Sequence, residues 1–496
     1  MGVVDRLSSV FKGREEFDLT DGNIGKPLFY LSLPIVVTNL LQTAYNLADT
    51  LWLGRYSTEA LAAISFAFPM VFLLFSLGMG ITVAGSVLVA QHVGADEESE
   101  AEYAASQTVS FAVVASLVLG AVGYFVVGDL LGLLGASPDV LPGATAYMRI
   151  ISSGLVFMFG FFVFTALMRG YGDTITPMLV MLLTVVINIV IDPFLIFGWW
   201  IFPELGVAGA AYATIFSRAV AFVVGMAVLL QGRRGVQINP ADMVPNLSYA
   251  RKIVRIGVPA SVEMTGRSLS VNLMLVIVGL FPTTVVAGYG IGVRVFSVIF
   301  LPAIAVARGV ETMTGQNIGA GKPDRAATAA GLAAKTMFVI LASLGVVTIL
   351  AAGPIASVFT SDPEVVAVTA DFLRWVAPTF GFIGVMRAYT GSFRGAGKTM
   401  TAAAISILML GVIRTPVALG LARPDILSLP IDGFGSTGIW MAFAVSNTAG
   451  AVIAYLWYRR GTWRDADPRG EPAPGDDEDG DADDNADAAG ATPTDD

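Results

Sequence analysis

The chain contains no cysteine and only one histidine, His92. The lack of cysteine excludes disulfides, thiolate zinc sites and thiol nucleophiles. With one histidine, a histidine metal site or an imidazole-dependent triad has a single candidate residue. Charged residues are also scarce, at 14% of the 496 residues. We therefore predict that the protein is not an enzyme, carries no cofactor and does not bind nucleic acid.

Hydrophobic residues, by contrast, make up 55% of the chain, and the mean hydropathy is +0.72. These values are typical of a membrane protein that crosses the bilayer several times. Residues 1–26 are polar and include Asp and Glu. They do not read as a cleavable signal peptide.

The formal net charge of -10 is concentrated at the C-terminus. Residues 465–496 contain 13 acidic side chains and one basic side chain, Arg469. Such a segment cannot bury enough apolar surface to fold. We predict a disordered acidic tail over 461–496. The acidic tail and the low lysine content, 6 of 29 basic residues, also hint at a salt-loving source.

Apolar runs long enough to cross a bilayer, about 20 residues each, recur twelve times, with a polar break at 231–255 after the sixth. The runs lie at about 28–54, 60–91, 104–131, 143–168, 175–198, 207–230, 254–281, 284–315, 328–352, 367–390, 400–421 and 436–458. The expected fold is all-α, with twelve transmembrane helices in two groups of six.

The basic residues of the short connections indicate the orientation, since Lys and Arg are retained on the cytoplasmic side. The side that contains both termini has many of them, whereas the opposite side offers little beyond Arg55 and Arg423. We predict a multi-pass protein of the cell membrane with both termini in the cytoplasm.

An internal repeat relates the two groups at a constant offset of 225 residues. It aligns Pro34 with Pro259, Gln91 to Ala95 with Gln316 to Ala320, and Arg169 to Thr174 with Arg394 to Thr399. Because each copy has six crossings, the copies are parallel and related by a pseudo-two-fold axis along the membrane normal.

The repeat divides the chain into five predicted parts, of which two are lobes of six helices each. These parts are a cytoplasmic N-terminal segment (1–26), the N-lobe (27–230), a cytoplasmic linker (231–253), the C-lobe (254–460) and the acidic tail (461–496).

Two acids interrupt apolar runs of the first lobe, Asp49 and Asp192. A charged side chain at the bilayer centre costs at least about 2.5–3.5 kcal/mol, so such residues are functional candidates. At the 225-residue offset they align with Met274 and Val417. A structural role shared by the two lobes would place polar residues in both, and this asymmetry favours function.

Three more polar residues are expected at the same depth in the first lobe. Asn188 lies one helical turn before Asp192, and Tyr147 and Thr214 lie a similar distance inside the membrane. This group could carry a proton, because buried neighbouring carboxylates resist being charged together. Alternatively, Asp49, Asn188, Asp192 and Thr214 could bind Na⁺ through hard oxygen ligands. A purely structural hydrogen-bonding role is the third interpretation.

Prolines and charged pairs in other spans have two interpretations each. Pro34 bends its helix, either as a hinge or as a fixed kink. Glu263 and Arg267 are four residues apart, a spacing that favours an ion pair within one helix over a second coupling site at Glu263. Arg308 and Glu311 favour a structural pair for the same reason.

Several motifs together resemble the multidrug and toxic compound extrusion (MATE) family, in its archaeal and bacterial DinF-like branch. They are Tyr45 to Thr50, Arg169 to Thr174, Asn188 to Pro193, Gly206 to Thr214 and Gly315 to Gly321. The resemblance covers about residues 20–460. It implies export of cationic or amphipathic compounds in exchange for protons or Na⁺.

The resemblance also assigns roles to residues of this chain. It implies coupling at Asp49, Asn188, Asp192, Tyr147 and Thr214, and bending at Pro34. Thr165 stands where the family often has Asn on the fourth helix, and its shorter side chain weakens the case for direct contact there.

The predicted function is therefore a secondary active efflux antiporter that works as a monomer, with a small cationic or amphipathic substrate and membrane lipid as its partners. Two rival functions remain open. A flippase for lipid-linked oligosaccharide would need a large cationic cavity. A membrane scaffold that does not transport would act through the acidic tail.

Overall fold

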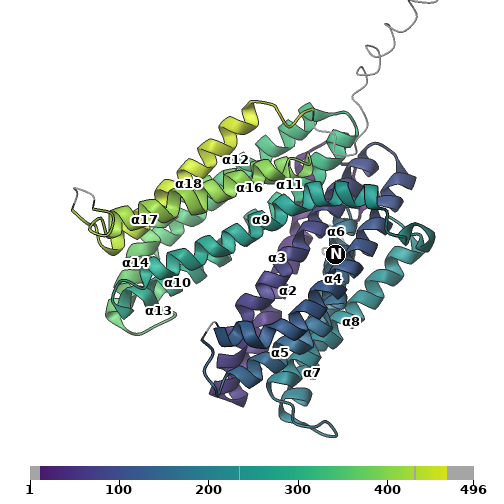
Figure 1. The fold of residues 1–496 in the computed structure, drawn as a ribbon. Helices are drawn as coiled ribbons and strands as arrows, with labels where there is room; N and C mark the ends of the chain where they lie inside the picture. The colour runs from purple at the N-terminus through teal and green to yellow at the C-terminus, as the bar shows by residue number, and fades with distance from the viewer. Residues whose placement is uncertain (1–11, 134, 234, 429–431, 466–496) are drawn as a thin grey trace, which may run out of the picture.

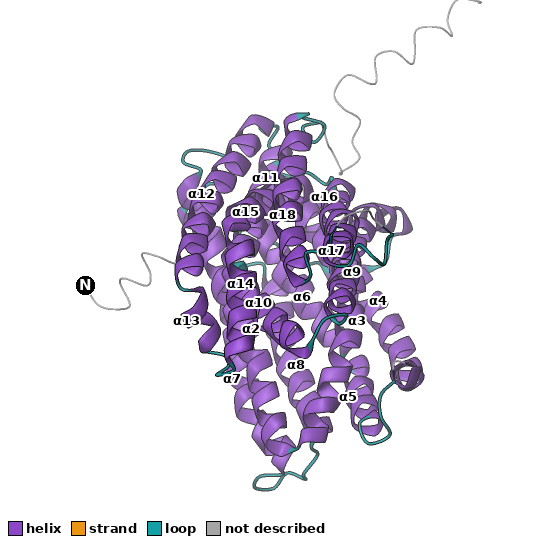
Figure 2. Cartoon of the chain, turned by 90° about the vertical axis from the view of Figure 1, so that its left-hand side faces the viewer, coloured by secondary structure: helices purple, strands orange, loops and turns teal. Residues whose placement is uncertain are grey.

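The structure is a computed structural model that describes residues 12–465, except 134, 234 and 429–431. Most of the predicted acidic tail lies outside these residues. Within the described ranges, every regular element is a helix, as Figure 2 shows. The prediction of an all-α protein is confirmed.

The first lobe begins after a short 3-10 helix, η1 (Arg14–Glu16), and contains six membrane crossings. These are α2 (Gly25–Tyr56), α3 (Thr58–Gly94), α4 (Glu98–Leu133), α5 with α6 (Leu141–Ser153 and Leu155–Tyr171), α7 (Ile175–Phe197) and α8 (Val207–Gln231).

The second lobe follows the short 3-10 helix η2 (Pro240–Met243) and repeats this order. Its elements are α9 (Leu247–Val278), α10 with α11 (Thr283–Ile299 and Leu301–Gly319), α12 (Pro323–Leu350), α13 (Ala352–Ser357), α14 with η3 and α15 (Pro363–Val376, Ala377–Thr379 and Phe380–Gly395), α16 with the π-helical η4 and α17 (Thr399–Ile407, Leu408–Arg414 and Thr415–Ala422), and α18 (Ser436–Arg459).

Nine of the described helices are long and apolar enough to cross a membrane, and two bent pairs raise the number to eleven. The twelfth crossing is α9, whose 32 residues include Glu263 and Arg267. All twelve predicted spans coincide with helices. However, α9 starts at Leu247, inside the segment predicted as a linker.

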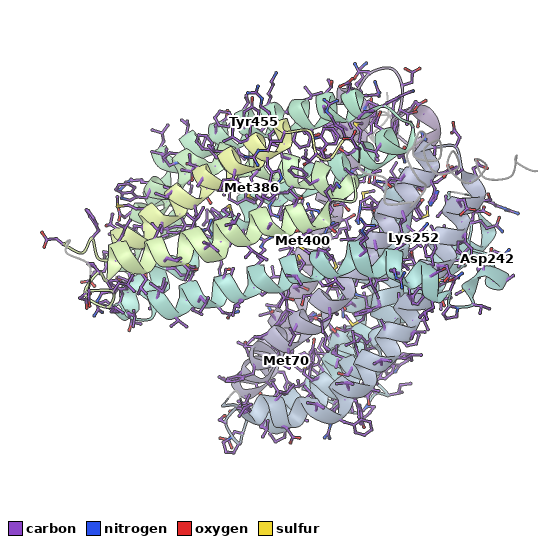
Figure 3. The ribbon with its side chains drawn as sticks, turned by 45° about the horizontal axis from the view of Figure 1, so that its top comes forward. Met70, Asp242, Lys252, Met386, Met400 and Tyr455 are labelled. Atoms are coloured by element: carbon purple, nitrogen blue, oxygen red, sulfur yellow. The ribbon has the colours of Figure 1, made fainter. Side chains whose placement is uncertain are left out.

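The two lobes meet at one end and diverge toward the other, so the molecule has the shape of a V (Figure 1). The lobes join where α3 and α11 end, which we call the inner end. Figure 3 shows Met70 on the arm of the first lobe and Met386 and Met400 on the arm of the second. The arrangement is closed at the inner end and open at the opposite, outer end.

Glycines allow the backbones of the two lobes to approach closely at the inner end. A Cβ atom at Gly94 would lie 1.9 Å from the carbonyl oxygen of Gln316, and one at Gly319 would lie 1.9 Å from that of Gln91. A larger residue at either position would push the lobes apart.

One break in the helices is shared by the two lobes, and another is present only in the second lobe. The bend of 55° between α5 and α6 occurs at Gly154, against which Ile215 of α8 packs. Its repeat equivalent, Thr379, also lies at a break, in η3. The bend of 41° between α10 and α11, at Phe300, has no equivalent, because α3 is continuous there.

The segment before α2 lies against the inner end of the second lobe. Leu19 is fully buried, and its carbonyl oxygen accepts a hydrogen bond from Asn317 Nδ2 at 2.9 Å. Arg325 donates to the carbonyl oxygens of Asp21 and Gly22. This segment therefore adds contacts to the closed end.

Candidate coupling site

Asp49 lies on α2 at the centre of the predicted site, with 4% of its surface exposed. Its carboxyl group interacts with the side chains of Asp192, Asn188 and Thr214. The first two belong to α7 and the third to α8. The structure thus brings together three helices of the first lobe, as the common depth of these residues suggests.

The remaining predicted residue, Tyr147, completes the group from α5. It is buried and lies within electrostatic range of both Asp49 and Asp192. Asn188 Nδ2 donates a hydrogen bond to Asp192 Oδ1 at 3.2 Å, across one turn of α7. All five predicted coupling residues lie in one buried cluster, which we call the acid cluster: Asp49, Tyr147, Asn188, Asp192 and Thr214.

Four oxygen atoms of the acid cluster are buried without a hydrogen-bond partner among the described residues. They are Asp49 Oδ1, Asn188 Oδ1, Asp192 Oδ2 and Thr214 Oγ1. Leaving a buried polar atom unsatisfied costs about 1–3 kcal/mol. Oxygens left in this way fit a hard monovalent cation, and the two carboxyl groups alternatively fit a shared proton.

Arg218, a basic residue that sequence reasoning missed, faces the acid cluster from α8. It is 2% exposed and lies within electrostatic range of Asp49. Its guanidinium group stacks over the ring of Tyr45 at 4.8 Å, and its Nη2 donates to Gln42 Oε1 at 2.9 Å. A lone arginine in an apolar run, one turn after Thr214, was a sufficient signal.

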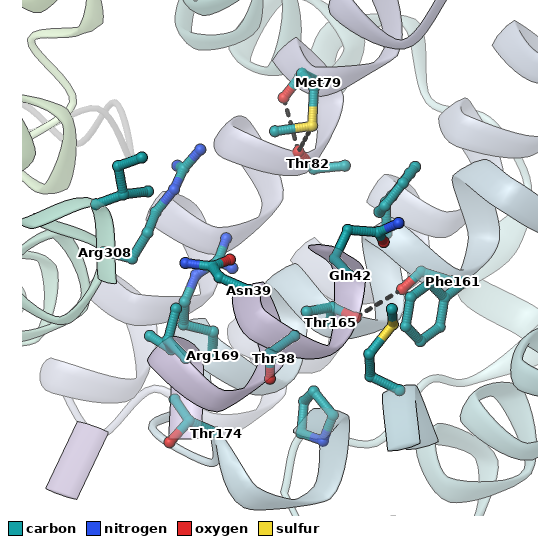
Figure 4. A pocket seen from close by; sticks show the side chains of 15 residues that line it. Thr38, Asn39, Gln42, Met79, Thr82, Phe161, Thr165, Arg169, Thr174 and Arg308 are labelled. Atoms are coloured by element: carbon teal, nitrogen blue, oxygen red, sulfur yellow. Dashed lines mark hydrogen bonds between the residues drawn. The ribbon is translucent and has the colours of Figure 1, made fainter. Parts of the chain in front are cut away.

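A cavity of about 250 Å³ lies between the two lobes, bounded by α2, α3, α6, α7 and α11. In Figure 4, Asn39, Arg169 and Arg308 lie on the left of this cavity, and Gln42 and Thr165 lie on its right. Gln42 is therefore shared between the cavity and Arg218. None of the described residues that line the cavity is acidic.

Thr165 lines this inter-lobe cavity and is not among the side chains that interact with Asp49. Its hydroxyl group donates to the carbonyl oxygen of Phe161 at 2.9 Å, within its own helix. The structure therefore does not place Thr165 in the acid cluster.

Glu263 has a different partner from the one expected. The prediction of an ion pair with Arg267 is wrong, because Glu263 Oε1 pairs with Arg394 Nη1 at 3.2 Å and accepts a hydrogen bond from Ser406 at 2.8 Å. Arg394 extends from α15 between the helices and also reaches Glu311. The carboxyl group of Glu263 is thus bound by side chains of two other helices, α15 and α16.

The second predicted pair, Arg308 with Glu311, is confirmed at 3.0 Å. Glu311 Oε2 also pairs with Arg394 Nε at 3.1 Å. Arg394 thus bridges two buried carboxylates, Glu263 and Glu311. We call these four residues the arginine bridge.

Pro34 lies inside α2, which continues through it as a helix from Gly25 to Tyr56. The hydroxyl group of Thr38 donates to the carbonyl oxygen of Pro34 at 2.8 Å. This added bond supports the helix near the proline, and bending at Pro34 stays a prediction. Over the described ranges, no cluster of three or more His, Cys, Asp or Glu side chains is arranged to hold a metal ion.

The fold and the buried site define a membrane transporter built from two repeated lobes. Comparison with known proteins identifies its family: the MatE family model matches twice, over residues 34–194 and 259–419. The two matched ranges are 225 residues apart at both ends, which confirms the internal repeat. The chain belongs to the MATE family of transporters.

Named relatives match over nearly their whole length. The chain is 29% identical over 449 residues to the probable multidrug resistance protein YpnP of Bacillus subtilis, covering 90% of this chain and 98% of that protein. It is 27% identical to an FAD transporter of Shewanella oneidensis, covering 90% and 97%.

A solved structure of similar fold is described as the outward-facing conformation of a multidrug resistance MATE family transporter, with a TM-score of 0.83 at 24% identity over 91% of this chain and 98% of that chain.

Proposed function

We propose that this protein is a secondary active efflux antiporter that exports small amphipathic molecules in exchange for a proton or a sodium ion. Multidrug export by named relatives, such as the multidrug export protein MepA of Staphylococcus haemolyticus, supports the direction of transport. The acid cluster would be the coupling site. With both termini in the cytoplasm, as the basic residues predict, the closed inner end is cytoplasmic and the structure represents an outward-open state.

The observation that carries this proposal is the pair of buried acids with unsatisfied oxygens. Asp49 and Asp192 bring two negative charges when ionised, and Arg218 brings one positive charge. One bound proton or one bound sodium ion would make the three groups neutral together. Because an uncompensated charge is costly at this depth, binding and release of that cation would strongly change the stability of the cluster.

Arg218 supplies a route from the acid cluster to the inter-lobe cavity. It lies within electrostatic range of Asp49 and donates to Gln42, which lines the cavity. A cation that neutralises Asp49 would weaken the electrostatic attraction between the acids and Arg218. Arg218 could then shift, and Gln42, to which it donates, would shift with it in the wall of the cavity. Ion binding and substrate binding would therefore compete.

Substrate chemistry follows from the cavity lining. Phe161, Phe162, Met79 and Met181 offer aromatic and polarisable surface, which suits varied amphipathic compounds. The two arginines, Arg169 and Arg308, do not favour the cationic compounds that the family resemblance implies. The lining therefore supports an amphipathic substrate without requiring a positive charge.

Transport of a fluorescent amphipathic dye by the purified protein in lipid vesicles would test the proposal. A proton gradient and a sodium gradient are imposed separately, and the gradient that drives dye movement identifies the coupling ion. Asp192→Asn should abolish this transport, whereas Asp129→Asn, an exposed acid of the same lobe, should leave it unchanged. Undiminished transport by Asp192→Asn would refute coupling at the acid cluster.

The two rival functions have their own tests. A lipid-linked oligosaccharide would need a much larger cavity than the one of about 250 Å³ between the lobes. A lipid-linked oligosaccharide should therefore not compete with the dye. A scaffold would lose its role when residues 465–496 are deleted, whereas the antiporter should keep most of its transport.

A further inference from the structure

A second cavity, of about 260 Å³, lies inside the second lobe between α9, α10, α11, α15, η4 and α18. Met386, labelled in Figure 3, is one of the residues that line it. Three arginines from three different elements line this cavity: Arg267, Arg387 and Arg414. The acid cluster belongs to the other lobe, so this cavity is a separate site.

The charges of these arginines are not compensated by acids. The guanidinium groups of Arg267 and Arg387 form no ion pair or hydrogen bond with the side chains of the described residues. Arg414 donates to neutral partners, Ser446 Oγ at 2.9 Å and Asn447 Oδ1 at 2.7 Å. The one acid within electrostatic range of both Arg267 and Arg387 is Glu263, which is already paired with Arg394.

Three positive charges around one apolar cavity are expensive unless a negative group joins them. Arg414 is buried, Arg267 and Arg387 are half-buried, and the charges of Arg267 and Arg387 repel each other. A guanidinium group presents a planar set of donors that matches a carboxylate or phosphate. The arrangement therefore points to an anionic ligand rather than to a structural role.

Aromatic side chains complete the cavity wall. Tyr289, Phe296, Phe300 and Phe443 line it together with the arginines. The guanidinium group of Arg414 lies 4.1 Å from the ring centre of Phe443, which fixes its position. A flat aromatic or aliphatic body would find apolar contacts next to the donors for its acidic group.

The second-lobe cavity adjoins the inter-lobe cavity. Ile304 of α11 lines both of them. The inter-lobe cavity adds Arg169 and Arg308, and no acidic residue is present among the described lining residues of either cavity. The two adjoining cavities together contain five arginines, of which Arg308 is paired with Glu311.

We propose that the second-lobe cavity binds the anionic group of an amphipathic organic substrate. Arg267, Arg387 and Arg414 hold a carboxylate or a phosphate, and the aromatic wall holds the apolar body. This inference rests on the proposed export function and names its substrate class. The same anionic chemistry could be presented by a soluble organic anion or by a lipid headgroup, and the experiment separates these sources.

The test measures binding in the absence of any ion gradient. Full-length protein in phosphatidylcholine nanodiscs is titrated with 1-naphthyl phosphate and, separately, with 1-naphthylmethylamine, which has a similar ring system and the opposite charge. Calorimetry should detect tighter binding of the phosphate. Equal or tighter binding of the amine would overturn the inference.

Variants locate the binding in the cavity. Arg267→Gln and Arg387→Gln should each weaken the affinity for naphthyl phosphate by about tenfold or more, because a charge-assisted contact is lost. Arg387→Lys should retain more affinity than Arg387→Gln, since it keeps the charge. Arg294→Gln, an exposed arginine of α10 outside the cavity, should bind like the wild type. Unchanged affinity in both glutamine variants would refute the site, provided that the wild type binds.

Nanodiscs that contain phosphatidylglycerol identify the source of the ligand. If a lipid headgroup is the occupant, phosphatidylglycerol should raise the apparent dissociation constant of naphthyl phosphate in the wild type but not in Arg387→Gln. If the occupant is a soluble anion, the two lipid compositions should give the same constant. Because binding needs no gradient, its failure would leave coupling at Asp49 and Asp192 intact, and loss of coupling would leave the binding result intact.

Discussion

Gln91 and Gln316 occupy equivalent positions in the two lobes, and each donates a hydrogen bond to the backbone of the opposite lobe. Gln91 Nε2 donates to the carbonyl oxygen of Gly395 at 3.0 Å, and Gln316 Nε2 donates to that of Gly170 at 3.0 Å. The two acceptors are themselves repeat equivalents. The pseudo-two-fold axis therefore passes through a reciprocal contact that closes the inner end.

This closure depends on glycine, so Gly319→Ala should open the inner end. Its Cβ atom would lie 1.9 Å from the carbonyl oxygen of Gln91, and only separation of the lobes relieves that overlap. Overpacking of this kind costs about 1–3 kcal/mol, which changes the ratio of two states by about 5–150-fold. We expect a shift away from the outward-open state.

Spin labels can measure this shift, because the chain has no cysteine of its own. Cysteines at the exposed outer-end positions Leu133 and Leu350 would report the separation of the lobes. Their distance should shorten in Gly319→Ala. Gly331→Ala, where an added Cβ meets no atom within 4 Å, should leave the distance unchanged. Identical distance distributions in Gly319→Ala and the wild type would contradict the role of this contact.

Removal of the positive charge beside Asp49 should tighten binding of the coupling ion. In Arg218→Gln the two acids lose their internal counter-charge and attract an external cation more strongly. We expect the ion concentration for half-maximal transport to fall by about tenfold, equivalent to ~1.4 kcal/mol, and the maximal rate to fall because release is slower.

Ion-dependent dye transport in vesicles gives both quantities for Arg218→Gln. The control is Arg149→Gln, an exposed arginine of the same lobe. A weaker dependence on the coupling ion in Arg218→Gln, or an unchanged one, would show that Arg218 does not share the charge of the acid cluster.

The sequence predicted most of the fold for a simple physical reason. A segment inside the bilayer must satisfy its backbone polar groups without water, and a single segment of about 20 apolar residues can do so on its own only as a helix. Length and apolar composition therefore located every crossing. The two bends also have local signals that the sequence analysis did not use: Gly154 itself, and Pro302 in the first turn of α11, which removes a backbone hydrogen bond.

The site was predicted in part for a similar reason. Asp49 and Asp192 stood out because acids are rare in apolar runs, and the repeat showed that the second lobe lacks them. The partner of Glu263 was not predictable from spacing, because Arg394 follows it by 131 positions and reaches it only through the packing of α15 against the second lobe. The spacing of four residues favoured Arg267 as the partner of Glu263, and that prediction was wrong.

The arginine bridge should stabilise the second lobe without taking part in coupling. Arg394→Gln would leave the buried carboxylates Glu263 and Glu311 without their common partner, which costs about 3–5 kcal/mol for a buried pair. We expect a clearly lower apparent melting temperature. Glu263→Gln should lower the melting temperature less, because Arg394 still pairs with Glu311. Transport by Glu263→Gln should still depend on the ion gradient.

Thermal unfolding in detergent and gradient-driven transport in vesicles separate these effects. Arg394→Lys, which keeps the charge but not the planar set of donors, should fall between the wild type and Arg394→Gln in stability. If Glu263→Gln is stable but no longer responds to the gradient, Glu263 is a second coupling site and the structural interpretation is wrong.

Bending of α2 at Pro34 is the remaining prediction for the transport cycle. Pro34 lacks the backbone N–H that would bond the carbonyl group of Tyr30, and this missing bond permits a bend in the part of α2 that precedes the acid cluster. Pro34→Ala restores the bond and should hold α2 straight. We expect dye transport to slow several-fold while equilibrium binding of the coupling ion is retained, because Asp49 lies four turns further along the helix.

Pro259→Ala is the matched comparison, since Pro259 occupies the equivalent position in α9. The second lobe has no acid where the first has Asp49, so straightening α9 should slow transport less than straightening α2. The distribution of distances between spin labels placed on either side of position 34 in α2 should also become narrower in Pro34→Ala. If Pro34→Ala transports at the wild-type rate, the proline is a fixed kink, and the movement that couples the acid cluster to the cavity must run through Arg218 and Gln42 alone.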